Sequence, residues 1–296
     1  MTSHAGASAS DARPDSTGAW EATNTVPTPW QVMKQVWTSR RLLSFLFLRT
    51  ARRLYRRTVL GWAWLFILPL FPLVLKVLVF GTIMGLPLVG PSYFVFLIAG
   101  QISWDLFEGA LSWGTRGLSL HGRLQTVRVP RVIMPIGATA PALIEFVING
   151  TILVLSLIWV IVRKGMIPGP GALALSLVTS FAALGVAFLL ATGIALFTSI
   201  LGEETRDMRF VIGQVMPVWY LLTPILYPLS SVPAHWRAWM ILNPMTGVVE
   251  TFKYAALGEG QPAYGLLAVS AGEALLILCV GMWFFARRDA VALDEA

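Results

Sequence analysis

Three charged side chains, Lys76, Glu145 and Glu273, lie inside stretches of sequence that are otherwise almost entirely apolar. A charge at membrane depth costs at least about 2.5 kcal/mol, so such a side chain normally faces a partner or a cavity. Lys76 and Glu273 each lie about 12 Å from the external end of their segment, which predicts an ion pair. Glu145 lies nearer mid-membrane and has no evident partner. The alternative to a structural pair is a proton-coupled or substrate-contacting role.

The patterns that mark a catalytic centre are missing from the sequence. It contains no G-x-x-x-x-G-K-S/T phosphate loop, no G-x-S-x-G nucleophile turn, and no His, Cys and carboxylate cluster with metal-ligand spacing. Asp105 and Glu108 are too weak a pair to indicate glycosyl transfer. We therefore expect no catalytic residue and no metal site in this chain.

The composition is that of an integral membrane protein. Of 296 residues, 56% are hydrophobic and only 12% are charged, whereas soluble domains carry about 25% charged residues. The net charge of +7 comes from basic residues that flank apolar segments. Such residues favour anionic lipid headgroups as partners over nucleic acid. The single cysteine, Cys279, permits no internal disulfide.

Six apolar segments are long enough to cross a membrane. They lie near 58–84, 93–113, 132–162, 172–201, 210–229 and 265–286. Most Lys and Arg residues fall on one side of these segments, and the other side holds only Arg163, Lys164, Arg237 and Lys253. The bias places both termini in the cytoplasm of a multi-pass protein of the cytoplasmic membrane.

The predicted fold is therefore an all-α integral membrane protein with six transmembrane helices. Residues 1–28 should be a disordered cytosolic tail, 29–57 an amphipathic interface helix, 58–288 the transmembrane domain and 289–296 a cytosolic tail. In the interface helix the apolar residues Leu43, Phe47, Ala51 and Leu54 recur at helical spacing, and Arg49, Arg52, Arg53 and Arg56 do so on another side. The arginines either anchor the helix on lipid phosphates or also guide an anionic lipid-linked substrate.

Prolines interrupt the chain after the fifth segment. Pro233 and Pro244 cut it into two short pieces, 234–242 and 245–257, and neither has the roughly 20 apolar residues of a span. They predict short re-entrant helices that border a pathway, because irregular backbone at membrane depth persists only in protein or beside a cavity. The alternative is an amphipathic external loop on the lipid surface.

Four segments, in this order, resemble the permease subunit of ABC-2 type exporters of O-antigen, teichoic acid and related polysaccharides. They are RRLYRRTVLGWAWLFILPL (52–70), FLIAGQISWDLFEGALSWGTRGL (96–118), LQTVRVPRVIMPIGA (124–138), and RDMRFVIGQVMPVWYLLTPILYPLSSVP (206–233) with LNP at 242–244. Lys76 and the residues before Trp30 depart from the family pattern.

The resemblance implies a homodimer with two separate nucleotide-binding ATPase subunits, which would bind the ATP and Mg, and a polyprenyl-pyrophosphate-linked glycan as substrate. It implies that a helix in loop 115–131 docks on the ATPase, although that basic loop could otherwise contact lipid headgroups. The coupling residues would be Gly117, Leu120, Arg123, Leu124, Arg128 and Arg131.

The resemblance also makes 231–257 the external gate, with Pro233, Trp236, Trp239, Met240 and Pro244 as its main residues. Aromatic faces suit sugar rings, so Trp62, Trp64, Trp219, Tyr220 and Tyr227 are candidates for a glycan conduit. The glycan could be of the O-antigen, teichoic acid or galactan type. Two other functions stay open: an ABC-2 type exporter of a small molecule or antibiotic, and a membrane-bound enzyme that modifies glycans or lipids.

Overall fold

The computed structural model describes residues 28–54, 64–85, 93–120, 130–164, 169–205, 207–258 and 262–294. Over these ranges the chain is helical and contains no β-strand, as predicted. The helices are α1 (Pro29–Thr38), α2 (Arg40–Leu54), α3 (Trp64–Lys76), α4 (Tyr93–Thr115), α5 (Gly117–Leu120), α6 (Ile133–Gly137), α7 (Ala140–Lys164), α8 (Pro170–Glu204), α9 (Asp207–Leu221), α10 (Ala234–Ile241), α11 (Pro244–Leu257) and α12 (Tyr264–Asp294), with a π-helix at Val77–Ile83 and a 3₁₀ turn at Leu229–Ser231. The predicted tail before position 28 lies outside the described residues.

Four helical stretches are long and apolar enough to cross a membrane: α4, 133–163 (α6 and α7), α8 and α12. Two shorter apolar helices, Pro69–Ile83 and Phe210–Leu221, lie where the first and fifth spans were predicted. The fifth was predicted to reach Leu229, but α9 ends at Leu221. Pro224 explains the early end, because a proline lacks the helical N–H and disfavours helical backbone in the residue before it.

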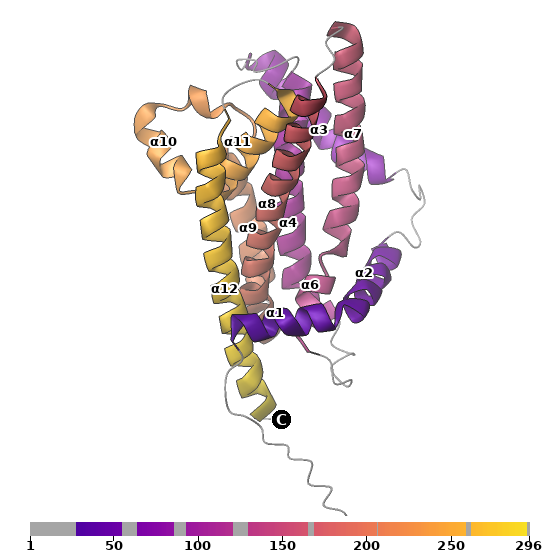
Figure 1. Ribbon diagram of the computed structural model, residues 1–296, viewed down its shortest axis with the longest axis vertical. Helices are drawn as coiled ribbons and strands as arrows, with labels where there is room; N and C mark the ends of the chain where they lie inside the picture. Colours follow the sequence, from indigo (N-terminus) through magenta and orange to yellow (C-terminus); the bar gives the residue numbers. More distant parts are fainter. Residues whose placement is uncertain are drawn as a thin grey trace, which may run out of the picture.

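Helix α4 forms the centre of the molecule (Figure 1). Leu97, Phe107 and Ala110 are fully buried, and the helix packs against α7, α8 and α11. The most extensive helix pair is α8 with α12. There the carbonyl of Gly193 lies so close to Gly281 that a side chain on Gly281 would collide with it. Small residues at such crossings let two membrane helices approach closely.

The two ends of the bundle carry different elements (Figure 1). One end holds α1, α6 and the C-terminal end of α12, and the opposite end holds α10 and α11. The predicted single interface helix at 29–57 is two helices, because Ser39 adopts a non-helical backbone (φ −92°, ψ 18°). Val32 and Leu46 are buried, and Leu46 packs against Gly137 of α6. The pair is therefore attached to the bundle at two points.

The two short helices predicted after the fifth segment are present as α10 and α11, within one residue of the expected bounds. Asn243 caps α11 by accepting a hydrogen bond from the Met245 N–H (3.0 Å). The helix ends at Gly258, whose φ of 66° is favourable for glycine. On α11, Gly247 packs directly against the Leu266 carbonyl of α12. At the other end of the chain, α12 continues to Asp294, past the predicted start of the C-terminal tail.

Candidate functional site

A network of polar side chains joins four helices inside the bundle. Lys76 of α3 donates hydrogen bonds to Gln101 Oε1 of α4 (2.9 Å) and to the Tyr220 hydroxyl of α9 (3.0 Å). The Tyr220 hydroxyl in turn donates to Gln101 Oε1 (2.8 Å). Asp105 accepts from Gln101 Nε2 (2.6 Å) and from Asn149 Nδ2 of α7 (3.0 Å). The network fixes α3, α7 and α9 to the central helix.

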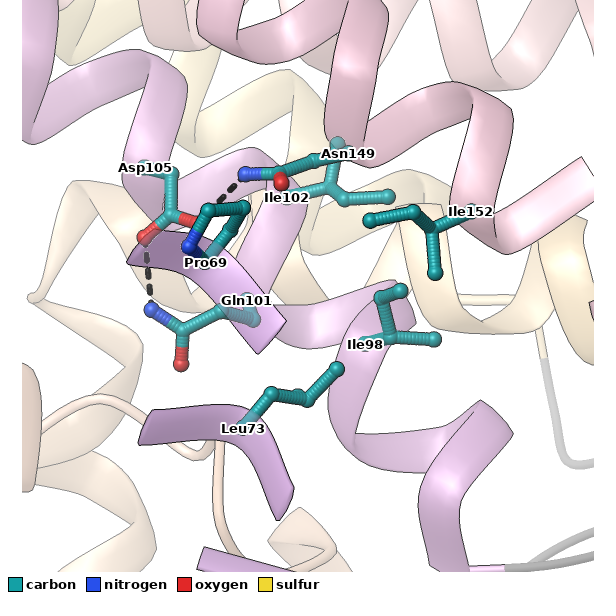
Figure 2. A pocket seen from close by; sticks show the side chains of 8 residues that line it. All are labelled: Pro69, Leu73, Ile98, Gln101, Ile102, Asp105, Asn149 and Ile152. Carbon is teal, nitrogen blue, oxygen red and sulfur yellow. Dashed lines mark hydrogen bonds between the residues drawn. The ribbon is translucent and has the colours of Figure 1, made fainter. Parts of the chain in front are cut away.

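A small hollow lies beside this network (Figure 2). Its volume of about 10 Å³ is near the lower limit for one water molecule. Figure 2 shows Gln101 and Asn149 reaching the Asp105 carboxylate from two sides. The other lining residues are Pro69, Leu73, Ile98, Ile102 and Ile152. The network is thus a joint between helices, and the hollow beside it is too small for a substrate.

The predicted ion pair between Lys76 and Glu273 is wrong. Lys76 bonds to Gln101 and Tyr220 and interacts electrostatically with Asp105 and Glu108. Glu273 lies on α12, and its Oε2 atom is buried with no hydrogen-bond partner among the described residues. Equal depth did not identify the partner because it says nothing of which helices are neighbours. Helix α3 packs on α4 and α7, whereas α12 packs on α8 and α11.

Glu145, the third predicted intramembrane charge, lies among other carboxylates. It interacts electrostatically with Asp105 and Glu108 of α4. The Glu108 carboxylate accepts a hydrogen bond from Trp104 Nε1 (2.6 Å). The sequence contained a usable signal for this face of α4: Gln101, Trp104, Asp105 and Glu108 recur at helical spacing within an apolar helix.

Aromatic rings continue the joint between α4 and α9. Trp219 lies edge-on to Trp104 and Phe107, with ring centroids 6.3 Å and 5.0 Å apart, and Tyr220 lies edge-on to Trp104 at 5.5 Å. Trp219 Nε1 donates to Asn243 Oδ1 (2.9 Å). Two predicted conduit aromatics therefore meet in one cluster, to which Trp104 and Phe107 are additions that the sequence reading missed.

The remaining predicted conduit aromatics do not join this cluster. The Tyr227 hydroxyl donates to the Leu221 carbonyl at the end of α9 (2.9 Å). Trp62 lies outside the described residues, and Trp64 is described for its backbone alone. Their role in a conduit stays a prediction.

Side chains supply the donors that the prolines remove between α9 and α10. Tyr93 donates to the Leu226 carbonyl (2.7 Å). Lys253 donates to the carbonyls of Pro224 and Tyr227, and it also lies over the Phe96 ring, 4.0 Å from the centroid. Unpaired backbone carbonyls away from water are costly, so these contacts stabilise the non-helical path.

Lys253 was predicted to face headgroups or water, and this prediction needs correction. Arg237, for which the same was predicted, is exposed. Lys253 is 4% exposed and bonds to the broken segment. Arg237 donates to the carbonyls of Val232 (2.7 Å) and Ser230 (2.6 Å). The positive charge of Lys253 was expected to seek solvent, but the carbonyls freed by prolines provide an alternative set of acceptors inside the protein.

The predicted gate aromatics lie on the surface of the single chain. Trp236 is 57% and Trp239 is 69% exposed, and α10 has no buried residue. Pro233 directly precedes α10, and Pro244 is the first residue of α11. Met240 is half-buried. A seal made by these exposed rings would therefore need a surface from another molecule to pack against.

At the opposite end of the bundle, Arg131 ties three helices together. It donates to both carboxylate oxygens of Glu203 on α8 (2.7 Å and 2.6 Å) and to Asp289 on α12 (3.0 Å). Gly117 of α5 packs on Pro135 so closely that a side chain there would collide with it. Of the other predicted coupling residues, Arg123, Leu124 and Arg128 lie outside the described residues, and Leu120 is described for its backbone alone.

The predicted arginine stripe is described in part. Arg49 is half-buried on α2, the backbone of Arg52 and Arg53 belongs to α2, and Arg56 lies outside the described residues. Trp30 and Trp37 on α1 and Phe45 on α2 are all more than half exposed. Exposed aromatic rings beside basic residues are typical of a helix lying in the membrane interface.

No family model matches the chain, but full-length relatives do. The O-antigen export system permease protein RfbA of Myxococcus xanthus is 25% identical over 274 residues, which cover 88% of this chain and 98% of the relative. The polysialic acid transport protein KpsM of Escherichia coli is 26% identical over 251 residues, covering 84% and 94%. The RfbA protein of Klebsiella pneumoniae is 24% identical over 234 residues, covering 78% and 85%.

Proposed function

We propose that this chain is the transmembrane subunit of an ATP-driven ABC exporter that moves a polysaccharide across the cytoplasmic membrane. The observation that carries the proposal is similarity over nearly the whole length of the permeases for O-antigen and polysialic acid. The order of the four ABC-2 type segments in the sequence supports the same function. Within the proposal, ATP is bound and hydrolysed by a separate subunit, because the sequence has no phosphate loop.

A second copy of this chain would complete the conduit. Helix α9 packs on the bundle through one stripe, which includes Ile212, Met216 and Trp219, and most of its other residues are exposed. Helix α3 is similar: Phe71 is 72% and Val74 is 56% exposed. Two copies facing each other through α3 and α9 would bury these apolar surfaces at least in part and enclose a path between them.

The substrate fits a lipid-linked glycan of the O-antigen, teichoic acid or galactan type. A hydrated polymer does not dissolve in hydrocarbon, so it needs a protein-lined path. Aromatic side chains such as Trp219 and Tyr220 offer flat apolar surfaces and a polar atom to sugar rings. The arginines of α2, including Arg49, would contact the pyrophosphate of the carrier at the cytoplasmic face.

Coupling and gating complete the proposal. Loop 115–131 would dock on the ATPase at the end of the bundle where Arg131 clamps α6, α8 and α12. Helices α10 and α11 would be re-entrant from the opposite face and close the outer mouth. Proline breaks on both sides of α10 let it move as a short rigid unit.

Deletion of the gene tests the function in the source cells. We expect the deletion strain to lose a cell-surface polysaccharide while its lipid-linked form accumulates in the cytoplasm. A plasmid copy of the intact gene should restore the surface polymer, and a copy with Arg123→Glu and Arg128→Glu should not, although its protein reaches the membrane. Unchanged surface polysaccharide in the deletion strain, with no internal accumulation, would contradict the function.

A further inference from the structure

A second hollow is separate from the α4–α9 joint. It has a volume of about 770 Å³ and lies between the broken segment, α11 and the first turns of α12. Figure 1 shows α10 and α11 beside the start of α12 at this end of the bundle. The lining residues are Phe96, Pro228, Leu229, Ser230, Arg237, Glu250, Lys253, Tyr254, Leu257, Pro262, Ala263, Gly265, Leu266 and Val269. Its volume falls within the usual range for small-molecule sites.

Three charged groups, Arg237, Glu250 and Lys253, lie on the wall, and each is held in place by neighbouring backbone or side chains. Arg237 is fixed by its bonds to the Val232 and Ser230 carbonyls, which use two of its five N–H donors. Glu250 is held by Lys253, whose Nζ lies 3.4 Å from Glu250 Oε1. A carboxylate has about four acceptor positions, and among the described residues Lys253 occupies one of those on Glu250, which leaves most of them for a ligand. The site therefore presents oriented donors and acceptors without first having to rearrange.

The other walls are apolar or aromatic. The Phe96 ring, Leu257 and Leu266 contribute hydrocarbon surface, and Tyr254 adds a ring held edge-on against Tyr264 (centroids 6.2 Å apart). Apolar walls with a few convergent polar groups are typical of a site for a compact ligand that has both kinds of surface.

The combination of charged groups and apolar walls disfavours two common membrane ligands, a phosphate headgroup and an acyl chain. A phosphate headgroup would find Lys253 Nζ already bound to the carbonyls of Pro224 and Tyr227 and to Glu250, and the Glu250 carboxylate would repel it. An acyl chain would cover the charged groups of Arg237 and Glu250 without satisfying them. A sugar ring suits both features, because its hydroxyls donate to a carboxylate and accept from a guanidinium, while its C–H faces lie on apolar and aromatic walls.

We propose that this hollow is a carbohydrate-binding subsite that takes a sugar unit of the exported polymer at the outer side of the membrane. Glu250 and Arg237 bind its hydroxyls, and Tyr254 packs on its face. The proposal rests on the proposed function for the identity of the ligand. Such a subsite would hold the emerging chain beside the gate helices and keep it from sliding back.

Photo-crosslinking in the producing cells tests the subsite with the cell's own polymer. The photoreactive residue p-benzoylphenylalanine replaces Ser230 on the wall, and in a matched control it replaces Leu276, which is 67% exposed on α12 far along the chain from the hollow. Adducts are analysed by mass spectrometry. We expect a ladder of masses spaced by one repeat unit at position 230, and single lipid masses only at position 276.

A second variant tests whether the adduct at position 230 depends on the proposed binding residue Glu250. Glu250→Ala should lower the glycan adduct at position 230 at least tenfold, while the amount of protein in the membrane stays unchanged, because Lys253 keeps its backbone acceptors. Single lipid masses at position 230, or no adduct in cells that still display the polysaccharide, would overturn the subsite and leave the exporter function standing. Surface polysaccharide that persists after gene deletion would instead overturn the function and the subsite together.

Discussion

The Gln101 side chain connects the charged groups of Lys76 and Asp105 by hydrogen bonds. Its carbonyl oxygen accepts from Lys76 and Tyr220, and its amide nitrogen donates to Asp105. In this way it links a positive and a negative charge that lie on different helices. Hydrogen bonds are stronger in a low-dielectric interior, and an unpaired polar group there is correspondingly costly. The network should therefore respond to loss of either charge.

Lys76→Met should destabilise the protein, because it leaves the Asp105 carboxylate without its nearby cation. It also removes the two hydrogen bonds of the Lys76 ammonium group, to Gln101 and Tyr220, and a hydrogen bond that involves a charged group contributes about 1.5 to 3 kcal/mol. Adding Asp105→Asn should recover part of that loss, since the second change removes the uncompensated charge. The thermal unfolding midpoints of the purified single and double variants in detergent measure this coupling.

Glu273 provides the control for this coupling. Lys76→Met combined with Glu273→Gln should show the sum of the two separate shifts, because the two side chains lie on helices that do not pack together. If Glu273→Gln restored the midpoint and Asp105→Asn did not, the assignment of the Lys76 partners would be wrong.

At the scale of the elements, Asn243 connects α9 to the short helices. Its Oδ1 atom caps α11 and accepts from Trp219 Nε1, and its Nδ2 atom donates to Thr223 Oγ1 (2.9 Å). One side chain thus joins the aromatic cluster, the end of α9 and the start of α11. Movement of α11 is expected to shift Trp219 and so the wall of the proposed conduit.

Asn243→Ala should loosen α10 and α11 relative to α12. Loss of an N-cap alone costs about 1 kcal/mol, and here Trp219 Nε1 also loses its acceptor. Hydrogen exchange should therefore become faster in the first turn of α11 while α12 keeps its protection. Asn243→Asp is the matched control, because it keeps the acceptor and loses only the Nδ2 bonds to Thr223 Oγ1 and to the Leu222 carbonyl. Equal exchange in the Ala and Asp variants would contradict the capping role.

Lys253→Met should disrupt the broken segment more than a change on the surface would. The methionine fills a similar volume but leaves the Pro224 and Tyr227 carbonyls without their donor. An unsatisfied buried acceptor costs about 1 to 3 kcal/mol. Limited proteolysis should find new cleavage between α9 and α10. Lys253→Arg keeps a donor and should therefore resist cleavage better than Lys253→Met. If Lys253→Met resisted cleavage as well as the parent protein does, these hydrogen bonds would contribute little to the stability of the segment.

The bounds of the helices were easier to predict from sequence than the contacts between side chains of different helices. Pro233 and Pro244 marked the starts of α10 and α11 because prolines act through local backbone chemistry. The contacts of Lys76 and Lys253 were mispredicted because they depend on which helices are adjacent and on which carbonyls a break leaves open. Trp104 was missed because a tryptophan in an apolar helix gives no signal by itself. It marks a recurring face of α4 only together with Gln101, Asp105 and Glu108.

At the scale of the whole molecule, the surfaces left open on one chain indicate where it assembles. Trp236 and Trp239 lie exposed at the end of the bundle that holds α10 and α11, and the apolar faces of α3 and α9 are exposed along its length. A second copy that covers α3 and α9 would bring two gate regions together at one mouth. The seal is then a property of the dimer.

The outer seal can be tested as an ion leak. Trp239→Ala with Met240→Ala should raise the small-ion permeability of vesicles that contain the reconstituted dimer without ATP, because the apolar closure is lost. Val280→Ala, on an exposed face of α12, serves as a control for general loosening and should change nothing. A double variant as tight as the parent would place the closure elsewhere, among the aromatics of α3 and α9.

The most direct test of the central claim is transport by purified components. The chain is reconstituted in vesicles with its nucleotide-binding subunit, and lipid-linked polysaccharide on the cytoplasmic face is supplied with ATP and Mg. We predict that ATP hydrolysis requires the partner subunit and that the polymer becomes accessible to a glycan-degrading enzyme on the opposite face. ATP hydrolysis by this chain alone, or hydrolysis by the complex with no polymer crossing the membrane, would contradict the account.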